Sequence, residues 1–210
     1  MADFSQEISG HTLEFFEDEH LYLVDGIIVP SITQILAYKF GGKYAHVRKD
    51  VLERAAQAGT AVHEAIERYC TTGEECELPE LRNFKFLQRQ YGFVVRKNEV
   101  PVILFDVCEG STSWTDNPPI AAGRLDLVLQ MGIEFGGADI KRTSTLDKEY
   151  LAYQLNLYRV AYRQCYGIEW DFLRGIHLRE DVRKFVQIPI NEGMAWQLVN
   201  DYLEANHAEH

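Results

Sequence analysis

The first thirty residues alternate short hydrophobic runs with polar turns. TLEFF (12–16) and LYLV (21–24) flank the acidic turn EDEH, and Asp25-Gly26 separates LYLV from IIV (27–29). Hydrophobic runs of this length between turn residues are typical of short strands joined by tight turns. The pattern therefore predicts a small antiparallel meander.

A helical pattern follows the meander. Ser31 and Gln34 have the spacing of a capping box, so a helix is expected to begin here and to end at Gly41-Gly42. From Asp50 to Cys70, small and apolar residues recur at steps of four and three, which predicts a helix with one buried stripe. The stripe consists of Ala55, Gly59, Val62, Ile66 and Tyr69.

The rest of the chain alternates between helical and strand-like segments. A helix is expected over 79–91, with a basic face that is interpreted as solvated. Strands are expected at VPVILFDV (100–107), IAAGRLDLVLQ (120–130) and ADIKR (138–142), with a turn at Met131-Gly132. A helix over 146–165, strands at FLRGIHL (172–178) and KFVQIPI (184–190), and a helix at MAWQLVNDYLEA (194–205) complete the order.

This order predicts a mixed α/β fold, with a central sheet flanked by helices and preceded by the meander. The 210 residues, of which 46% are hydrophobic, are enough for a substantial core, and we expect one domain. Its parts would be an N-terminal meander and helix (1–50), a core (51–190) and a C-terminal helix (191–210).

Charge and cysteine usage narrow the function classes. The formal net charge of −11 argues against coating nucleic acid by bulk electrostatics, although a local site is compatible with it. The four cysteines (Cys70, Cys76, Cys108 and Cys165) contain no CxxC pair, which favours reduced structural thiols. With no long apolar run and no signal-peptide pattern, we expect a cytoplasmic protein that does not contact membranes.

Two aspartates in hydrophobic strands carry the candidate chemistry. An aspartate in such a strand costs several kcal/mol unless it is paired, hydrogen-bonded or bound to a metal. A hairpin with its turn at Met131-Gly132 would bring Asp126 close to Asp139, and Lys141 would share a sheet face with Asp139. Two carboxylates that hold a divalent cation beside a lysine suit phosphodiester hydrolysis. The alternative is a structural ion pair between Asp139 and Lys141.

Four motifs, in their order along the chain, favour the metal site over the structural ion pair. GTAVHEAIERY (59–69), AAGRLDLVL (121–129), ADIKRTS (138–144) and YQLNLYR (153–159) resemble the RecB-like branch of the PD-(D/E)xK nuclease superfamily. That branch is marked by GxxxH, GxxD, D/E-x-K and QxxxY. YLVDGIIVPSITQIL (22–36) is also similar to a segment of phage exonucleases and of the mitochondrial genome maintenance exonuclease.

The resemblance implies a restriction-endonuclease-like core and assigns residues. His63, Asp126, Asp139 and the carbonyl of Ile140 would bind Mg²⁺ or Mn²⁺, and Lys141 would be the catalytic lysine together with Asp126 and Asp139. Oxygen ligands suit these ions, and one imidazole suits Mn²⁺ as well. No iron-sulfur cluster is expected, because no cysteine follows Cys165.

Further residues are candidates for contact with DNA or for orienting the lysine. They are Gln154, Tyr158, Ser31, Thr33, Lys43 and Arg142. Core packing explains Tyr158 equally well, and ordinary helix capping explains Ser31 almost as well. Glu99, just ahead of the first core strand, is interpreted as a solvated strand end, with a role in metal binding as the alternative. Gly136-Gly137 is interpreted as a bulge or bend before Asp139.

The sequence thus favours a metal-dependent DNA nuclease, expected to act as an exonuclease that leaves 5′-phosphate ends. Its partner would be DNA, as single strands or duplex ends, together with recombination or replication proteins, and it would serve recombination, repair or replication in a prokaryotic or phage-infected cell. Two alternatives stay open: a DNA-binding accessory module that keeps the nuclease fold without turnover, and a hydrolase of small phosphoesters.

Overall fold

The N-terminal residues form a four-stranded antiparallel sheet. The computed structural model describes residues 3–42, 47–107 and 113–207. In the first range, the strand order is β1-β2-β3-β4, each strand hydrogen-bonded to the next. The strands are β1 (Phe4–Ile8), β2 (His11–Phe16), β3 (Leu21–Val24) and β4 (Ile27–Val29). The predicted meander is confirmed, and β1 adds an edge strand that the sequence pattern did not indicate.

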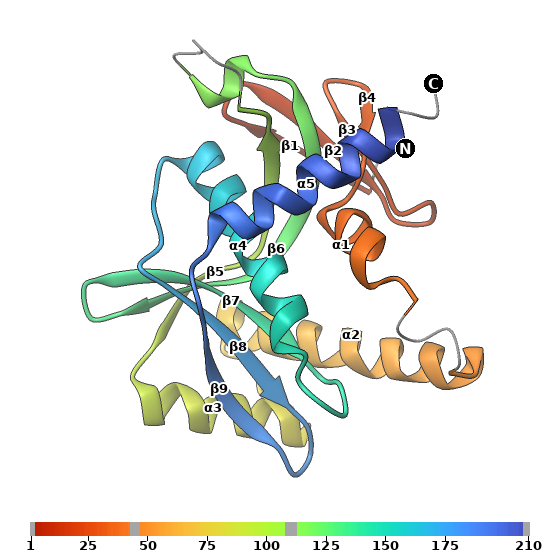
Figure 1. Ribbon diagram of the computed structural model, residues 1–210. Coiled ribbons are helices and arrows are strands. Elements are labelled where there is room, and N and C mark those ends of the chain that lie inside the picture. Colours follow the sequence, from red (N-terminus) through yellow and green to blue (C-terminus); the bar gives the residue numbers. More distant parts are fainter. Residues whose placement is uncertain (1–2, 43–46, 108–112, 208–210) are drawn as a thin grey trace.

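A five-stranded mixed sheet forms the centre of the molecule (Figure 1). Its order is β5-β6-β7-β8-β9, and every neighbouring pair is antiparallel except β7 with β8. The strands are β5 (Val94–Phe105), β6 (Pro119–Met131), β7 (Glu134–Lys141), β8 (Phe172–Leu178) and β9 (Arg183–Ile188). A short 3₁₀ helix (Trp114–Asp116) precedes β6.

Helices cover both faces of this sheet and divide the core in two. One cluster of buried residues joins α1, α4, α5 and the small sheet to the central sheet. The other lies between the opposite face and the pair α2 and α3. The helices are α1 (Ile32–Phe40), α2 (Lys49–Thr72), α3 (Pro79–Tyr91), α4 (Lys148–Tyr166) and α5 (Glu192–His207). The predicted fold class, a mixed sheet flanked by helices and preceded by a meander, is therefore confirmed.

Helix α2 departs from the predicted stripe in its first half. Val62 and Ile66 are buried, but Ala55 is exposed and Gly59 only half-buried. Figure 1 shows the reason: the N-terminal turns of α2 extend beyond the edge of the sheet. A period of 3.6 residues predicted the helix correctly, but it did not reveal where the helix leaves the core.

The two glycines before Asp139 form no bulge. Gly136 and Gly137 pair in regular register with β6 and with β8. A Cβ on Gly136 would lie 2.3 Å from the ring of Phe172, and one on Gly137 would lie 2.1 Å from the ring of Trp170. The predicted bulge is therefore wrong, and the glycines are needed because these two aromatic rings lie against the strand.

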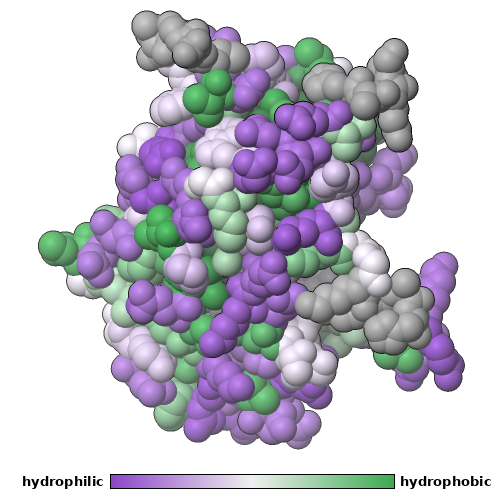
Figure 2. All heavy atoms as spheres, viewed as in Figure 1, coloured by the Kyte–Doolittle hydropathy of each residue, from purple (hydrophilic) through white to green (hydrophobic). Residues whose placement is uncertain are grey.

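The surface seen in Figure 2 is largely hydrophilic, with an apolar tip on the hairpin between β6 and β7. At this turn Ile133 is 92% exposed. Among the described helices, none combines the length and the hydrophobicity needed to cross a lipid bilayer.

Candidate metal centre

Three acidic residues occupy one row across neighbouring strands of the central sheet. The register of β5 with β6 places Glu99 opposite Asp126. Continuing the register of β6 with β7 places Asp126 opposite Asp139. Side chains at opposite positions share a sheet face, so the fold gathers carboxylates from three strands.

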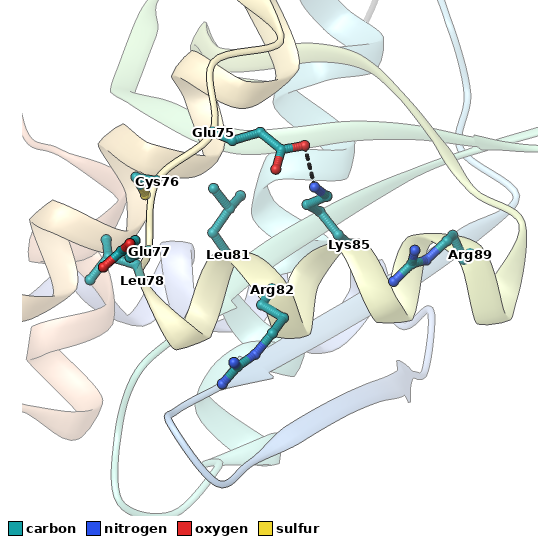
Figure 3. A pocket seen from close by; sticks show the side chains of 8 residues that line it. All are labelled: Glu75, Cys76, Glu77, Leu78, Leu81, Arg82, Lys85 and Arg89. Carbon is teal, nitrogen blue, oxygen red and sulfur yellow. Dashed lines mark hydrogen bonds and ion pairs between the residues drawn. The ribbon is translucent and has the colours of Figure 1, made fainter.

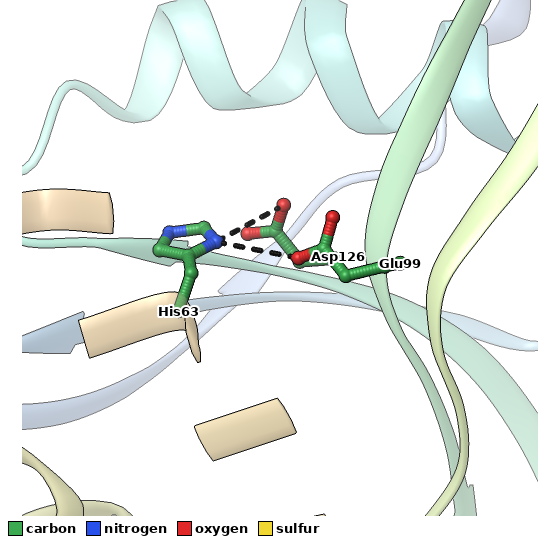
Figure 4. A group of neighbouring side chains, drawn as sticks. All are labelled: His63, Glu99 and Asp126. Carbon is green, nitrogen blue, oxygen red and sulfur yellow. Dashed lines mark ion pairs between the residues drawn. The ribbon is translucent and has the colours of Figure 1, made fainter. Parts of the chain in front are cut away.

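His63 on α2 completes a group that could hold a cation. Its Nδ1 lies 3.6 Å from Oε1 of Glu99 and 3.7 Å from Oδ1 of Asp126. Figure 4 shows the imidazole pointing toward both carboxylates. One ligand atom from each of these three residues lies within 4.8 Å of the other two. At Nε2 the ring is 3.1 Å from the carbonyl oxygen of Ile140, to which it can donate a hydrogen bond.

Asp139 is paired with Lys141. The lysine Nζ lies 2.9 Å from Oδ1 and 2.7 Å from Oδ2 of the carboxylate, whose residue is 1% exposed. The backbone between them is also held, because the amide of Ile140 donates to Oδ2 of Asp126 at 2.6 Å. These contacts fix the end of β7 against β6 at the candidate site.

Burial and mutual charge shift the pKa values of this cluster. Burial lowers the pKa of His63, but the carboxylates, Asp126 first, outweigh burial and raise the pKa to about 9. Burial raises the pKa of Asp139 to about 6 despite the adjacent Lys141 ammonium, and it also raises the pKa of Asp126. For Lys141, burial lowers the pKa, but Asp139 and Asp126 outweigh it, so the pKa is raised. The ammonium therefore stays protonated at neutral pH.

The donor set fits a hard divalent cation. Two carboxylates and one imidazole are ligands that Mg²⁺ or Mn²⁺ accepts, and Asp139 lies in the adjacent row position. Relative to the predicted ligands, the structure brings Glu99 into contact with His63 and Asp126, while Asp139 pairs with Lys141. The structure thus groups Glu99 with His63 and Asp126, whereas the motifs imply Asp139 and the Ile140 carbonyl as the further ligands.

The interpretation of Glu99 as a solvated strand end is wrong. Its side chain is 20% exposed, and its second carboxylate oxygen lies 2.8 Å from Nε of Arg124. Glu99 also has a φ of 46° within β5, a conformation that few residues other than glycine adopt. The only sequence signal was a glutamate whose strand position faces Asp126, and recognising it requires the register.

The two residues of the QxxxY motif lie inside the protein. Gln154 is 5% and Tyr158 is 4% exposed, and Tyr158 belongs to the main core cluster. A Cβ on Gly123 would lie 3.1 Å from the Tyr158 hydroxyl. Gly123 of the GxxD motif therefore packs against Tyr158 of the QxxxY motif, and this contact lies three residues before Asp126 on β6.

The other predicted DNA contacts have mixed surroundings. Ser31 is 3% exposed and accepts the amide of Gln34 at 3.1 Å in the predicted capping box, whereas Thr33 is exposed. Arg142 donates from Nε to the buried Glu80 at 2.8 Å. Lys43 lies outside the described residues. Ser31 and Arg142 are thus already engaged in structural contacts.

A hollow of about 840 Å³ opens over the candidate site. His63, Glu99 and Lys141 lie in its wall, and the exposed half of α2 forms one side. Three arginines also line it: Arg124, Arg142 and Arg179. Four glutamates line it as well, Glu17, Glu64, Glu67 and Glu99, so the wall carries both signs of charge. Arg124 pairs with Glu99 and Arg142 with Glu80.

A second hollow, of about 500 Å³, lies along α3 (Figure 3). The basic face predicted for this helix, Arg82, Lys85 and Arg89, borders it. Lys85 forms an ion pair with Glu75 of the preceding acidic loop. Part of the positive charge is therefore neutralised locally.

Comparisons with known proteins add a likeness in fold only. No family model and no curated protein matches the sequence. Fifteen chains of solved structures match the fold. One of them, the crystal structure of SSO0001, is 14% identical, with a TM-score of 0.48 over 84% of this chain and 76% of that chain. A likeness of this degree says nothing about activity.

Proposed function

We propose that the protein is a divalent-metal-dependent deoxyribonuclease. It would hydrolyse phosphodiester bonds as an exonuclease and leave 5′-phosphate ends. The convergence of His63 on α2 with Glu99, Asp126, Asp139 and Lys141 on three neighbouring strands supports this most directly. We further propose that it acts on DNA in recombination, repair or replication in the cytoplasm of a prokaryotic or phage-infected cell.

In this proposal, some residues of the site bind the metal and Lys141 supplies a positive charge. Glu99, Asp126 and His63 would hold the cation, with Asp139 beside them. A bound Mg²⁺ or Mn²⁺ would polarise the phosphoryl group and increase the acidity of water. The Lys141 ammonium, fixed by Asp139, would orient the attacking water and stabilise the negative charge that develops on the phosphate. Of the arginines in the wall of the hollow, Arg179 would hold a flanking phosphate, because Arg124 and Arg142 already pair with Glu99 and Glu80.

Cleavage assays with matched variants test this proposal. End-labelled single-stranded and duplex DNA are incubated with the full chain in Mg²⁺ or Mn²⁺. We expect Asp126→Asn and Lys141→Met to lower kcat by at least about 100-fold, a typical loss for an electrostatic group at a reacting centre. Asp18→Asn changes an exposed aspartate in the same way and should leave kcat unchanged.

A metal titration tests the ligand set separately. Glu99→Gln should weaken Mn²⁺ binding, measured by calorimetry or electron paramagnetic resonance, whereas Glu53→Gln on the exposed half of α2 should not. Equal cleavage by the wild type and Asp126→Asn would refute the nuclease. DNA binding without cleavage, undiminished by EDTA, would instead support a non-catalytic accessory module. Cleavage of nucleotides with DNA spared would indicate a hydrolase of small phosphoesters.

A further inference from the structure

A cavity of about 340 Å³ adjoins the hollow of about 840 Å³ over the candidate metal centre. Helix α1 supplies Thr33, Ala37, Phe40 and Gly41, and the segment from β7 into α4 supplies Lys141, Thr143, Asp147 and Tyr150. We call this cavity the aromatic cup. Lys141 and Thr143 line both hollows, so the cup opens directly beside the candidate metal centre.

The wall of the cup has the chemistry of a site for a flat heterocycle. The rings of Phe40 and Tyr150 lie 5.4 Å apart at 66°, and Phe40 also contacts Tyr153 at 5.6 Å. Ala37 adds an apolar surface, while Thr33 and Thr143 bring hydroxyl groups. A few polar groups in a mainly apolar cavity are typical of sites for small organic groups, and this volume is near the lower end of their range.

The position of Lys141 favours a nucleobase as the heterocycle in the aromatic cup. Its Nζ lies 5.7 Å from the centroid of the Tyr150 ring and 2.9 Å from Oδ1 of Asp139. The same ammonium thus faces the cup and the proposed phosphodiester site. A nucleotide whose phosphate lies at Lys141 would have its base within reach of the cup.

We propose that the aromatic cup binds the nucleobase next to the scissile phosphate. This proposal rests on the proposed function, because it takes the group at Lys141 to be a phosphodiester. Stacking on aromatic side chains accepts every base, since each base has a π-face. The base must leave its stack to enter, so the cup favours single strands and frayed ends over internal duplex.

Filling the cup without disturbing the metal centre is the decisive perturbation. Ala37 is exposed on α1, and leucine is a good helix former, so Ala37→Leu should fold normally. Ala61→Leu, at an exposed position of α2 that does not line the hollows described above, is the matched control. Both variants are compared with the wild-type full chain.

The first readout is cleavage of single-stranded oligonucleotides that carry one abasic nucleotide at successive positions. We expect one position beside the cleaved bond to lower kcat/KM by about 5- to 150-fold, the range for losing one base-aromatic stack. Ala37→Leu should cause a similar loss on intact DNA and no further loss on that abasic strand. Ala61→Leu should match the wild type.

The second readout does not need turnover. Fluorescence anisotropy in Ca²⁺ compares an intact single strand with a fully abasic strand of equal length. The wild type and Ala61→Leu should bind the intact strand more tightly, and Ala37→Leu should reduce this difference.

The two readouts separate the two proposals. If neither cleavage nor binding changes with abasic sites or with Ala37→Leu, base binding by the cup is refuted and the proposed nuclease activity stands. Binding that depends on the cup without any cleavage would support the cup and overturn the nuclease. Neither cleavage nor base-dependent binding would overturn both.

Discussion

Replacing Gly137 with alanine tests why β7 carries two glycines before Asp139. The added Cβ would lie 2.1 Å from Cζ3 of Trp170 and 2.6 Å from Cε3 and Cη2 of the same ring. Trp170 cannot move aside easily, because it is 1% exposed and packs 4.8 Å from the ring of Tyr162. Strand β7 is also paired on both sides, so its backbone cannot withdraw.

The expected loss follows from overpacking. Inserting a methyl group into a filled core costs about 1–3 kcal/mol. In a chain of this size, each kcal/mol changes Tm by about 2–4 °C, so we expect Tm to fall by roughly 2–12 °C. Gly59→Ala has the opposite expectation. This residue lies within α2 with nothing within 4 Å of its Cβ position, and the substitution should stabilise the helix by about 0.5–1 kcal/mol.

Urea and thermal unfolding of both variants give the signs directly. If Gly137→Ala is as stable as the wild type, the proposed contact with Trp170 does not limit the strand. A double-mutant cycle with Trp170→Leu adds a check, because the smaller side chain should recover part of the loss. Since Asp139 and Lys141 follow on the same strand, Gly137→Ala should also weaken metal binding.

Other predictions concern the pKa values of two histidines and the N-terminal cap of α1. With the pKa of His63 raised to about 9, metal affinity measured by calorimetry should rise about tenfold per pH unit from 7 to 9; a flat profile would contradict a protonated ligand. In the metal-free protein, this shift stabilises the fold fully below about pH 6.5, and the stabilisation is lost as pH rises through 9. Ser31→Ala should cost about 1 kcal/mol in urea unfolding through loss of the α1 cap, and Ser31→Thr less. Burial lowers the pKa of His11, but Asp25 and the Thr115 carbonyl outweigh it and raise the pKa. An NMR titration should therefore give a value above 6.5 that falls in Asp25→Asn, and an unchanged value there would refute this cause.

Local signals predicted most of the secondary structure. The capping box at Ser31, the Asp25-Gly26 turn and the helix over 79–91 depend on residues close in sequence, and all three are confirmed. Strand β1 escaped prediction because it lies at a sheet edge and only Ile8 of its five residues is buried. A strand of this kind has no alternating pattern to reveal it.

Long-range contacts explain what the sequence could not supply. The motifs led to His63, Asp126, Asp139 and Lys141, which the fold brings together. Recognising that Glu99 belongs to the site requires the register of β5 with β6. Its position also depends on a backbone conformation that no local pattern indicates. Likewise, the reason for Gly136-Gly137 lies in aromatic residues more than thirty positions further along the chain, which only the parallel strand β8 and its preceding loop bring near.

The row of carboxylates across β5, β6 and β7 has a consequence for the evolution of this chain. Without a cation, the buried aspartates are held against burial and mutual repulsion, as their raised pKa values indicate. Asparagine in place of Asp126 would relieve this repulsion, whereas asparagine in place of Asp139 would leave the Lys141 ammonium without its partner. A laboratory population selected for heat resistance alone should therefore lose Asp126 but keep the pair of Asp139 and Lys141, whereas selection that also requires the proposed metal-dependent activity should retain both aspartates.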